Sequence, residues 1–268
     1  MKRIHFRHVA FLSSALIIAA CSVVPVTGRK QLKLLPESTL IEMGLTSYND
    51  FLKENKLSTD ATNTHMIKQV GNNLASASNR FLRDNGLADE VSNYKWAYNL
   101  VEDKTVNAWC MPGGKIVFYT GILPLTKNEA GAAVVMGHEI AHAIAKHGNE
   151  RMSQGLIQQL GGVALSVALQ EKPEETQQLY LTAYGIASNV AVILPYSRKQ
   201  EYEADRLGLI LMAMAGYNPN EAVSFWQRMA ALSSNPMPAF LSTHPTDANR
   251  IEQIKKYLPE AMKYYKKK

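Results

Sequence analysis

The sequence predicts an α+β fold that is predominantly α-helical, with a small sheet beside one buried helix. Apolar residues recur at helical spacing along most of the chain, whereas strand signals cluster at 94–101 and 115–119. The 268 residues contain no internal repeat or low-complexity linker and are enough to bury one substantial core. Helices around a short sheet are typical of the α+β class.

The first 20 residues have the pattern of a secretory signal peptide. A basic start is followed by an apolar run over 9–20, and the small pair Ala19-Ala20 precedes Cys21. The run is too short to span a bilayer, so we expect cleavage. The segment resembles a bacterial lipobox, which predicts a lipid on Cys21 as a membrane anchor. The alternative is ordinary cleavage, with Cys21 an incidental residue.

Cleavage before Cys21 changes the bulk properties of the chain. Removing 20 of the 268 residues leaves 248, and losing the three cations of the signal lowers the formal net charge from +6 to +3. No basic face interleaved with aromatic residues is apparent, so we expect no nucleic-acid partner. Ser22 after the cysteine indicates an outer-membrane lipoprotein that faces the periplasm.

The mature chain is expected to consist of a tether, one domain and a short tail. Residues 21–36 are interpreted as a lipidated tether with little regular structure, and the basic tail 263–268 as solvated. The domain, 37–262, is expected to begin with helices over about 38–53 and 60–83.

A sheet edge is expected just before the second strand. The turn Pro112-Gly113-Gly114 follows an irregular stretch, Asn107–Met111, which we place at that edge. An exposed edge can bind an extended peptide as an added strand, and Asn107 is then a candidate for contacting its amides. A purely structural hairpin is the alternative. With Cys21 lipidated, Cys110 has no disulfide partner.

His138-Glu139-Ile140-Ala141-His142 has the pattern of a catalytic zinc site on a helix. Residues four apart share one helical face, so His138 and His142 can bind one ion. Zinc acidifies a bound water molecule, and a carboxylate beside it, here Glu139, can take the proton as the water attacks a carbonyl. Two incidental histidines beside a surface glutamate are the alternative.

The residues around this motif favour the zinc interpretation. Positions 130–145 are otherwise almost all small or apolar, which predicts a buried helix in which polar side chains are costly unless a metal satisfies them. Thr126 and Glu129 form a capping box that would begin this helix, and Gly148 would end it. His147 is interpreted as a residue of the helix end rather than as a ligand.

A catalytic zinc needs a third protein ligand and an open fourth position. A further histidine on the following turns is excluded, because Ala145 and Gly148 occupy the positions that this pattern requires. Glu150 follows the helix too closely to fold back, and the glutamates of 171–175 lie in a polar turn. We therefore expect the third ligand within Ser197–Asp205.

This segment is expected to begin a second helix. Ser197 and Gln200 form another capping box, and the helical pattern runs to about Ala215. Glu203 points away from the apolar stripe of this helix and is expected to be solvated.

Glu201 and Asp205 lie one turn apart on that stripe, together with Ala204 and Gly208. The two small residues would let another helix approach closely, which a shared metal requires. Buried carboxylates need partners, and zinc for Glu201 with a histidine N–H or an arginine for Asp205 would supply them. An exposed acidic helix start is the alternative.

Two apolar stretches, 155–169 and 179–194, separate these motifs. They are interrupted by polar residues and glycines, and they are too polar or too short for membrane spans. One interpretation is a pair of core or lid helices over the cleft. The other is a surface that rests on lipid or grips unfolded membrane proteins.

The motifs together resemble a known family. His-Glu-Ile-Ala-His at 138–142 and Ser-Arg-x-x-Glu-Tyr-x-Ala-Asp at 197–205 resemble the zinc metallopeptidases that include HtpX and the CAAX prenyl endopeptidase. The segment 107–116 and Ser-Thr-His-Pro at 242–245 resemble the lipoprotein-like branch of that family. The motifs span about 106–250, and the departure is Cys110, where a small or aliphatic residue is expected.

The resemblance implies a zincin-like metallopeptidase domain that binds one zinc ion per chain. It implies His138, His142 and Glu201 as ligands and Glu139 as the base. It also implies a supporting role for Asp205, either as proton donor or as a carboxylate that orients a ligand. Arg198, within the second motif, is a candidate substrate-binding residue.

His244 has three possible roles. Pro245 biases it towards an extended conformation in a turn ahead of a helix expected over about 246–258. It could stabilise the oxyanion, displace the catalytic water and keep the enzyme latent, or simply cap the neighbouring helix at the surface.

The function predicted from these residues is a membrane-anchored zinc endopeptidase for misfolded or damaged envelope proteins. The alternative is a non-catalytic or latent lipoprotein that holds clients or an assembly machine in the same cleft. The presence of Glu139 favours the enzyme, because a structural zinc site needs no base and fills all four positions with protein ligands.

Overall fold

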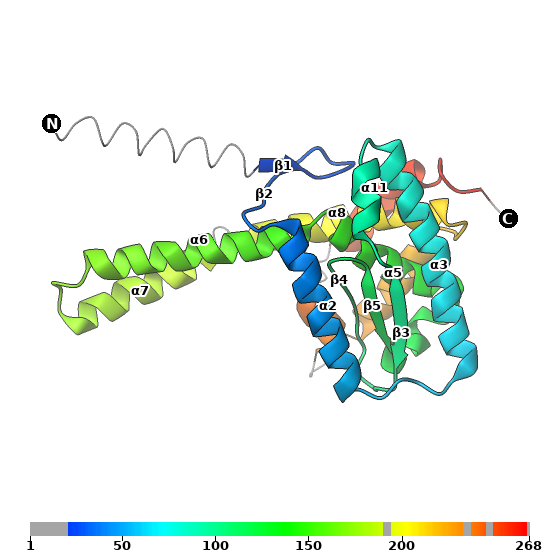
Figure 1. Ribbon diagram of the computed structural model, residues 1–268, viewed down its shortest axis with the longest axis horizontal. Helices are drawn as coiled ribbons and strands as arrows, with labels where there is room; N and C mark the ends of the chain where they lie inside the picture. Colours follow the sequence, from blue (N-terminus) through cyan, green and yellow to red (C-terminus); the bar gives the residue numbers. More distant parts are fainter. Residues whose placement is uncertain (1–20, 190–193, 233–236, 245–248, 267–268) are drawn as a thin grey trace. The chain divides into compact units, whose positions relative to one another are not determined.

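The computed structural model describes residues 21–189, 194–232, 237–244 and 249–266. The chain forms two compact units, one of Met1–Glu37 with Lys146–Pro195 and one of Ser38–Ala145 with Tyr196–Lys268. Both units are mainly helical and their sheets are small (Figure 1), which confirms the predicted α+β class.

The larger unit contains a three-stranded sheet. Its strands are β3 (Ala97–Val101), β4 (Ala108–Met111) and β5 (Lys115–Tyr119), in the order β3-β5-β4. β5 is parallel to β3 and antiparallel to β4. The stretch Asn107–Met111 was expected to be irregular, but Ala108–Met111 forms the regular strand β4. It pairs with β5 because Gly113 and Gly114 adopt φ angles of 83° and 79° and turn the chain directly back into β5. Its expected position at the edge of the sheet is confirmed.

Helices make up most of the rest of this unit. They are α2 (Glu37–Glu54), α3 (Ala61–Asp84), η1 (Ala88–Asn93), η2 (Thr120–Ile122), α4 (Leu123–Thr126), α5 (Glu129–Ile144), α8 (Leu194–Met214), α9 (Glu221–Ala231), α10 (Ala239–Thr243) and α11 (Arg250–Ala261). α2 and α3 confirm the two helices expected at the start of the domain. α5, which carries the zinc motif, packs against α3, β4 and α9 and is buried along nearly its whole length, as its apolar sequence predicts.

Both ends of α5 differ from the prediction. Thr126 ends α4, where its hydroxyl donates to the carbonyl of Leu123, so it does not cap α5. Lys127 then adopts a φ angle of 63°, the chain reverses, and the side chain of Asn128 accepts from the N–H of Gly131 as the true N-cap.

At its other end, α5 stops because Lys146 adopts a left-handed conformation, with a φ angle of 57°. A new helix, α6 (His147–Ala168), begins at the next residue. Gly148 therefore lies inside α6 and does not end α5, and His147 is a fully buried residue at the start of α6.

Two expectations for α8 were also wrong. The helix already begins at Leu194, so Ser197 lies inside it and does not act as N-cap. Glu203 was expected to be solvated but is only 7% exposed, because α8 is buried on nearly all sides from Gln200 onwards.

The smaller unit joins the amino-terminal residues to a helical hairpin. β1 (Cys21–Val23) and β2 (Lys30–Leu32) pair antiparallel, so the expectation of little regular structure in 21–36 was wrong in part. The segment is held on α6 because Arg29 forms two hydrogen bonds of 2.6 and 2.7 Å with the buried carboxylate of Glu150. The main chain at Leu34 and Leu35 also bonds to α6 side chains.

α6 contains most of the first apolar stretch expected between the motifs, and α7 (Glu174–Ser188) contains the described part of the second up to Ser188. The two helices lie side by side as an antiparallel hairpin (Figure 1). Their large apolar side chains are mostly exposed, so they are not core helices. No helix in the described part of the chain is long and apolar enough to cross a membrane.

Several predicted features lie outside the described residues. These are the signal segment 1–20, the side chain of Cys21, residues 190–193 and the turn 245–248. Cleavage and lipidation therefore stay predictions.

Candidate metal centre

The centre is built where α5 and α8 cross at two glycines. A Cβ atom on Gly208 would lie 2.9 Å from the main-chain nitrogen of His138, and one on Gly137 would lie 3.0 Å from the carbonyl oxygen of Gly208. The two backbones are therefore in contact. The prediction that Gly208 lets another helix approach closely is confirmed, and this contact brings Glu201 to the histidines of α5.

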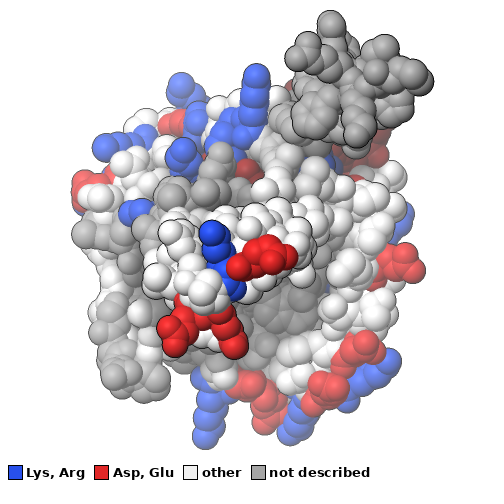
Figure 2. All heavy atoms as spheres, turned by 90° about the vertical axis from the view of Figure 1, so that its left-hand side faces the viewer, with Lys and Arg blue, Asp and Glu red and all other residues white. Residues whose placement is uncertain are grey.

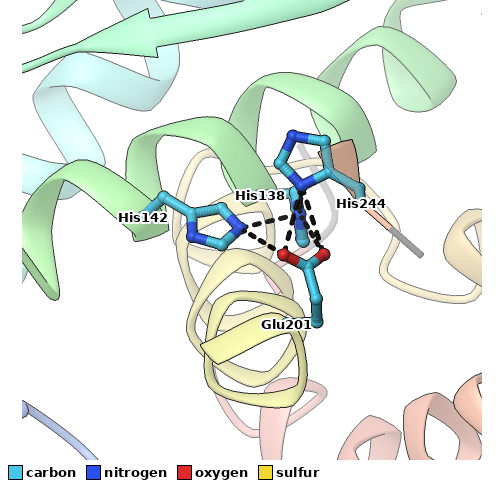
Figure 3. A group of neighbouring side chains, drawn as sticks. All are labelled: His138, His142, Glu201 and His244. Atoms are coloured by element: carbon cyan, nitrogen blue, oxygen red, sulfur yellow. Dashed lines mark hydrogen bonds and ion pairs between the residues drawn. The ribbon is translucent and has the colours of Figure 1, made fainter. Parts of the chain in front are cut away.

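Four side chains converge at this crossing (Figure 3). Among the described residues, His138, His142, Glu201 and His244 form the group whose ligand atoms all lie within 4.8 Å of one another. The Nε2 atoms of His138 and His142 are 3.1 Å apart, and each lies 3.3 Å from one oxygen of Glu201. Separations of about 3.3 Å are those expected between ligands that share a tetrahedral zinc at about 2.0–2.1 Å.

His244 supplies the fourth donor. It follows α10, is 8% exposed, and has its Nδ1 atom 3.2 Å from both His138 Nε2 and Glu201 Oε2. This burial is inconsistent with a histidine that caps a helix at the surface. Three imidazoles and one carboxylate are a donor set that fits zinc.

The charges of the centre support metal binding. Burial lowers the pKa of His138, but hydrogen bonds and negative charges from Asp205 and Glu201 outweigh it and raise the pKa to about 9. Burial raises the pKa of Glu201, but the charge of His142 and hydrogen bonds from the three histidines hold it well below its usual range. Glu201 is thus an anion ready to bind a cation, and His138 must release a proton when a metal binds.

Glu139 lies beside the four candidate metal ligands, and one of its carboxylate oxygens accepts no hydrogen bond. The residue is 4% exposed, and its Oε1 atom is 3.2 Å from His244 Nε2, but the contact lacks hydrogen-bond geometry. A buried carboxylate oxygen without a donor is costly. It is suited to accept a proton from a molecule bound at the centre.

Asp205 has both kinds of partner that the sequence called for. Its Oδ1 atom lies 3.0 Å from His138 Nδ1, and Arg250 of α11 bonds to both carboxylate oxygens at 2.8 and 2.9 Å. Burial raises the pKa of Asp205, but the charge of Arg250 and the contact with His138 outweigh this effect and lower the pKa below its usual value. The carboxylate therefore stays ionised.

Arg250 is the functional residue that sequence reasoning missed. It is 1% exposed, stacks 3.5 Å above the ring of Trp226, and reaches Glu201 at 3.2 Å and the carbonyl of His244 at 3.3 Å. The buried Asp205 was expected to have a histidine N–H or an arginine as partner, but nothing in the sequence pointed to this arginine, 45 residues further along the chain.

The remaining candidates lie outside the four-residue group. The side chain of Asn107, at the start of the β4 edge, accepts from the N–H of Ala108. Arg198 is exposed on α8, three residues before Glu201. Burial and the charge of Glu139 raise the pKa of Cys110 well above its usual value, so it remains a neutral thiol. The glutamates of 171–175 are exposed, as predicted.

Comparison with known proteins identifies relatives of this arrangement. The model of peptidase family M48 matches residues 63–258. The chain is 37% identical over 173 residues to the mitochondrial metalloendopeptidase OMA1 of Schizosaccharomyces pombe, covering 64% of this chain and 49% of the relative. It is 31% identical over 252 residues to the mitochondrial metalloendopeptidase OMA1 of Homo sapiens, covering 90% and 46%.

A bacterial relative is more distant. The chain is 26% identical over 200 residues to the beta-barrel assembly-enhancing protease of Yersinia pestis, covering 72% of this chain and 38% of the relative. The chain thus spans about half the length of these curated relatives, or less.

Proposed function

Because the chain belongs to peptidase family M48, whose members use zinc, we propose that it is a zinc-dependent endopeptidase. Its proposed substrates are misfolded or damaged proteins of the bacterial envelope. The observation that carries the enzymatic proposal is the buried carboxylate of Glu139, whose Oε1 atom has no hydrogen bond although it lies beside a complete set of zinc donors. A structural zinc site has no use for such a group.

The side chains divide the work of peptide hydrolysis. When bound, zinc supplies Lewis-acid chemistry that polarises the peptide carbonyl and acidifies water. Glu139 takes the proton of the attacking water and then gives it to the leaving amine. Asp205 holds the Nδ1 side of His138, which keeps Nε2 directed at the centre, and Arg250 holds Asp205.

The substrate backbone is proposed to bind along β4. This strand lies at the edge of the sheet, packs against α5, and therefore runs close to the helix that carries Glu139. An added strand is held by main-chain hydrogen bonds, which suits an enzyme that acts on unfolded chains of many sequences. Asn107 and Arg198 remain proposed contacts for the substrate.

The proposed location is the outer membrane, facing the periplasm, with a lipid on Cys21. The lipobox-like sequence before Cys21 supports it, as does the resemblance of 107–116 and 242–245 to the lipoprotein-like branch of the family. The relative in Yersinia pestis is named for the assembly of β-barrels, which favours substrates of the envelope.

A latent or non-catalytic client-binding protein is the second candidate. The position of His244 favours it, because Nδ1 lies 3.2 Å from His138 and would complete a four-ligand site. Zinc with four protein ligands is typical of closed sites. In this candidate the cleft binds clients, and hydrolysis begins only after His244 moves away.

Comparing the wild type with Glu139→Gln tests the function. Glu139→Gln is expected to retain zinc and fold but to lose cleavage of casein, because an amide cannot accept the proton. Glu201→Ala is expected to lose zinc as well, measured by metal analysis, whereas Glu175→Gln, an exposed site on α7, changes neither. Cleavage by Glu139→Gln at a rate near that of the wild type would contradict the proposal.

A further inference from the structure

α6 carries a stripe of large apolar side chains with a heptad-like spacing. Its members are Met152, Leu156, Leu160, Val163 and Val167, which are 42, 38, 58, 56 and 60% exposed. Spacings of four and three residues keep all five on one side of the helix. A stripe of this kind on a helix is the surface by which one helix packs against another.

α7 does not cover this stripe. The contacts within the hairpin lie on the other side of α6. There the hydroxyl group of Tyr184 donates to the main-chain carbonyl oxygen of Gln158, and the side-chain amide of Gln158 donates to the hydroxyl group of Ser188. Gln158 follows Leu156 by two residues and so lies about 200° round the helix from it. The stripe thus faces away from α7.

The charges of the hairpin are separated between its two ends. No charged residue occurs from Met152 to Gln170, which leaves the side of α6 uncharged. The turn carries Glu171, Lys172, Glu174 and Glu175, all exposed, with a net charge of −2. In Figure 2, which faces the turn of the hairpin, acidic and basic side chains lie together at its tip.

The other end of the hairpin is basic. Arg151 precedes the stripe directly and is exposed. β2 and its flanks, bound to α6 through Arg29 and Glu150, add Lys30 and Lys33. The hairpin is therefore acidic at its turn, basic at its base and apolar between them.

We propose that this stripe is the contact between two copies of the chain, with their α6 helices antiparallel about a two-fold axis near Leu160. A two-fold contact must be self-complementary, and the stripe meets this requirement. When two copies of the stripe lie antiparallel, Met152 of one copy lies opposite Val167 of the other, and Leu156 lies opposite Val163. Arg151 of each copy then falls within about one helical turn of Glu171 of the other.

The size of the contact fits a weak, reversible dimer. The stripe runs over 16 residues of α6, from Met152 to Val167, and the shared length with its flanks is about 30 Å. Two single helices in contact over such a length bury less than about 1,200 Å² in total, which is the size range of weak or transient interfaces.

A lipid surface fits these observations less well. Helices that lie on membranes have basic residues on the face next to the apolar one. Here that face has no charges, and the turn is acidic, so anionic lipids would repel it. The self-complementary charges favour a second copy instead.

Disulfide cross-linking of the full chain tests the proposal. In a Cys110→Ser background, Leu160→Cys is expected to give a disulfide-linked dimer on mild oxidation, because the two thiols meet near the axis. Ile186→Cys on α7 is the matched control, since Ile186 is 61% exposed and Leu160 58%. Equal yields from the two cysteines, or no dimer from Leu160→Cys, would overturn the proposal.

Charge reversal tests the orientation of the two copies. Because the two-fold axis repeats each contact, Glu171→Arg removes two attractions and is expected to weaken the dimer about tenfold in sedimentation analysis. Adding Arg151→Glu is expected to restore it. A dimer that Glu171→Arg leaves unchanged, or that the double variant does not restore, contradicts the antiparallel pairing.

Discussion

At the candidate metal centre, two of the proposed ligands are held by contacts that fix their orientation. His138 is held at Nδ1 by Asp205, and Glu201 lies 3.2 Å from the guanidinium of Arg250. Arg250 itself cannot move far, because Trp226 lies under it and Asp205 binds it at two points. Geometry of this kind orients ligands before the metal arrives.

We expect Asp205→Asn to lower zinc affinity by about 10–100-fold, as loss of a group that orients a ligand usually does. Arg250→Lys is expected to have a similar effect, because an ammonium group cannot form the two parallel bonds that the guanidinium makes. Zinc affinity is measured by competition with a chelator, which does not depend on activity. Unchanged affinity in both variants would make this pair purely structural.

Substitution of His244 distinguishes its remaining roles. His244→Ala is expected to raise basal casein cleavage if the histidine keeps the site latent, since its removal opens the fourth position. It is expected to lower turnover about 100–1,000-fold with zinc retained if the histidine stabilises the oxyanion. The measurement is the cleavage rate together with bound zinc per chain. An unchanged rate would exclude both roles.

At the scale of elements, the contact between α5 and α8 sets the distance between the two halves of the site. Gly137 and Gly208 let the backbones meet, and no flexible side chain stands between them. His138 and His142 could be identified from their spacing on one helix. Their distance from Glu201, in contrast, depends on how closely two separate helices pack.

Gly208→Ala is therefore expected to destabilise the fold by about 1–3 kcal/mol, as insertion into a packed contact does. It should also weaken zinc binding, because the new methyl group would push the helices apart. Gly155→Ala on α6 is the matched control: its Cβ meets no atom within 4 Å, so we expect a gain of about 0.5–1 kcal/mol. Thermal unfolding with and without zinc measures the stability and the zinc binding of both variants. Equal stability of Gly208→Ala and Gly155→Ala would contradict the close contact between α5 and α8.

The ends of the helices were the least predictable elements. The Thr126–Glu129 pair has the sequence of a capping box, yet Asn128 caps α5, because α4 occupies the residues before it. Lys146, in turn, takes a backbone conformation that usually requires glycine. Local sequence signals locate a helix, but the packing of the preceding element decides where it starts and ends.

For the whole molecule, the amino-terminal segment belongs to the unit of the α6–α7 hairpin, through the contact of Arg29 with Glu150. If Cys21 carries a lipid, that anchor enters the protein at this unit. The hairpin is then the part of the chain connected most directly to the membrane.

The wild type is expected to fractionate with membranes and to incorporate labelled palmitate, because a lipid on Cys21 anchors it. Cys21→Ser is expected to lose the label and to become soluble or to be retained as an uncleaved precursor of higher mass. Cys110→Ser should behave as the wild type. A Cys21→Ser chain of mature size that stays equally membrane-bound would place the anchor in the apolar faces of the hairpin.

The sequence by itself determined the chemistry of the site and the class of the fold. Spacing on a helix assigns His138 and His142 to one face with Glu139 beside them, and the cost of burying Asp205 calls for a cationic or N–H partner. Only the tertiary structure decided which residues meet across long stretches of chain. Arg250 reaches Asp205 from α11, and His244 reaches the metal donors from the end of α10. Helical periodicity is a local property, whereas these contacts depend on how several helices pack together, and no local pattern in the sequence encodes that.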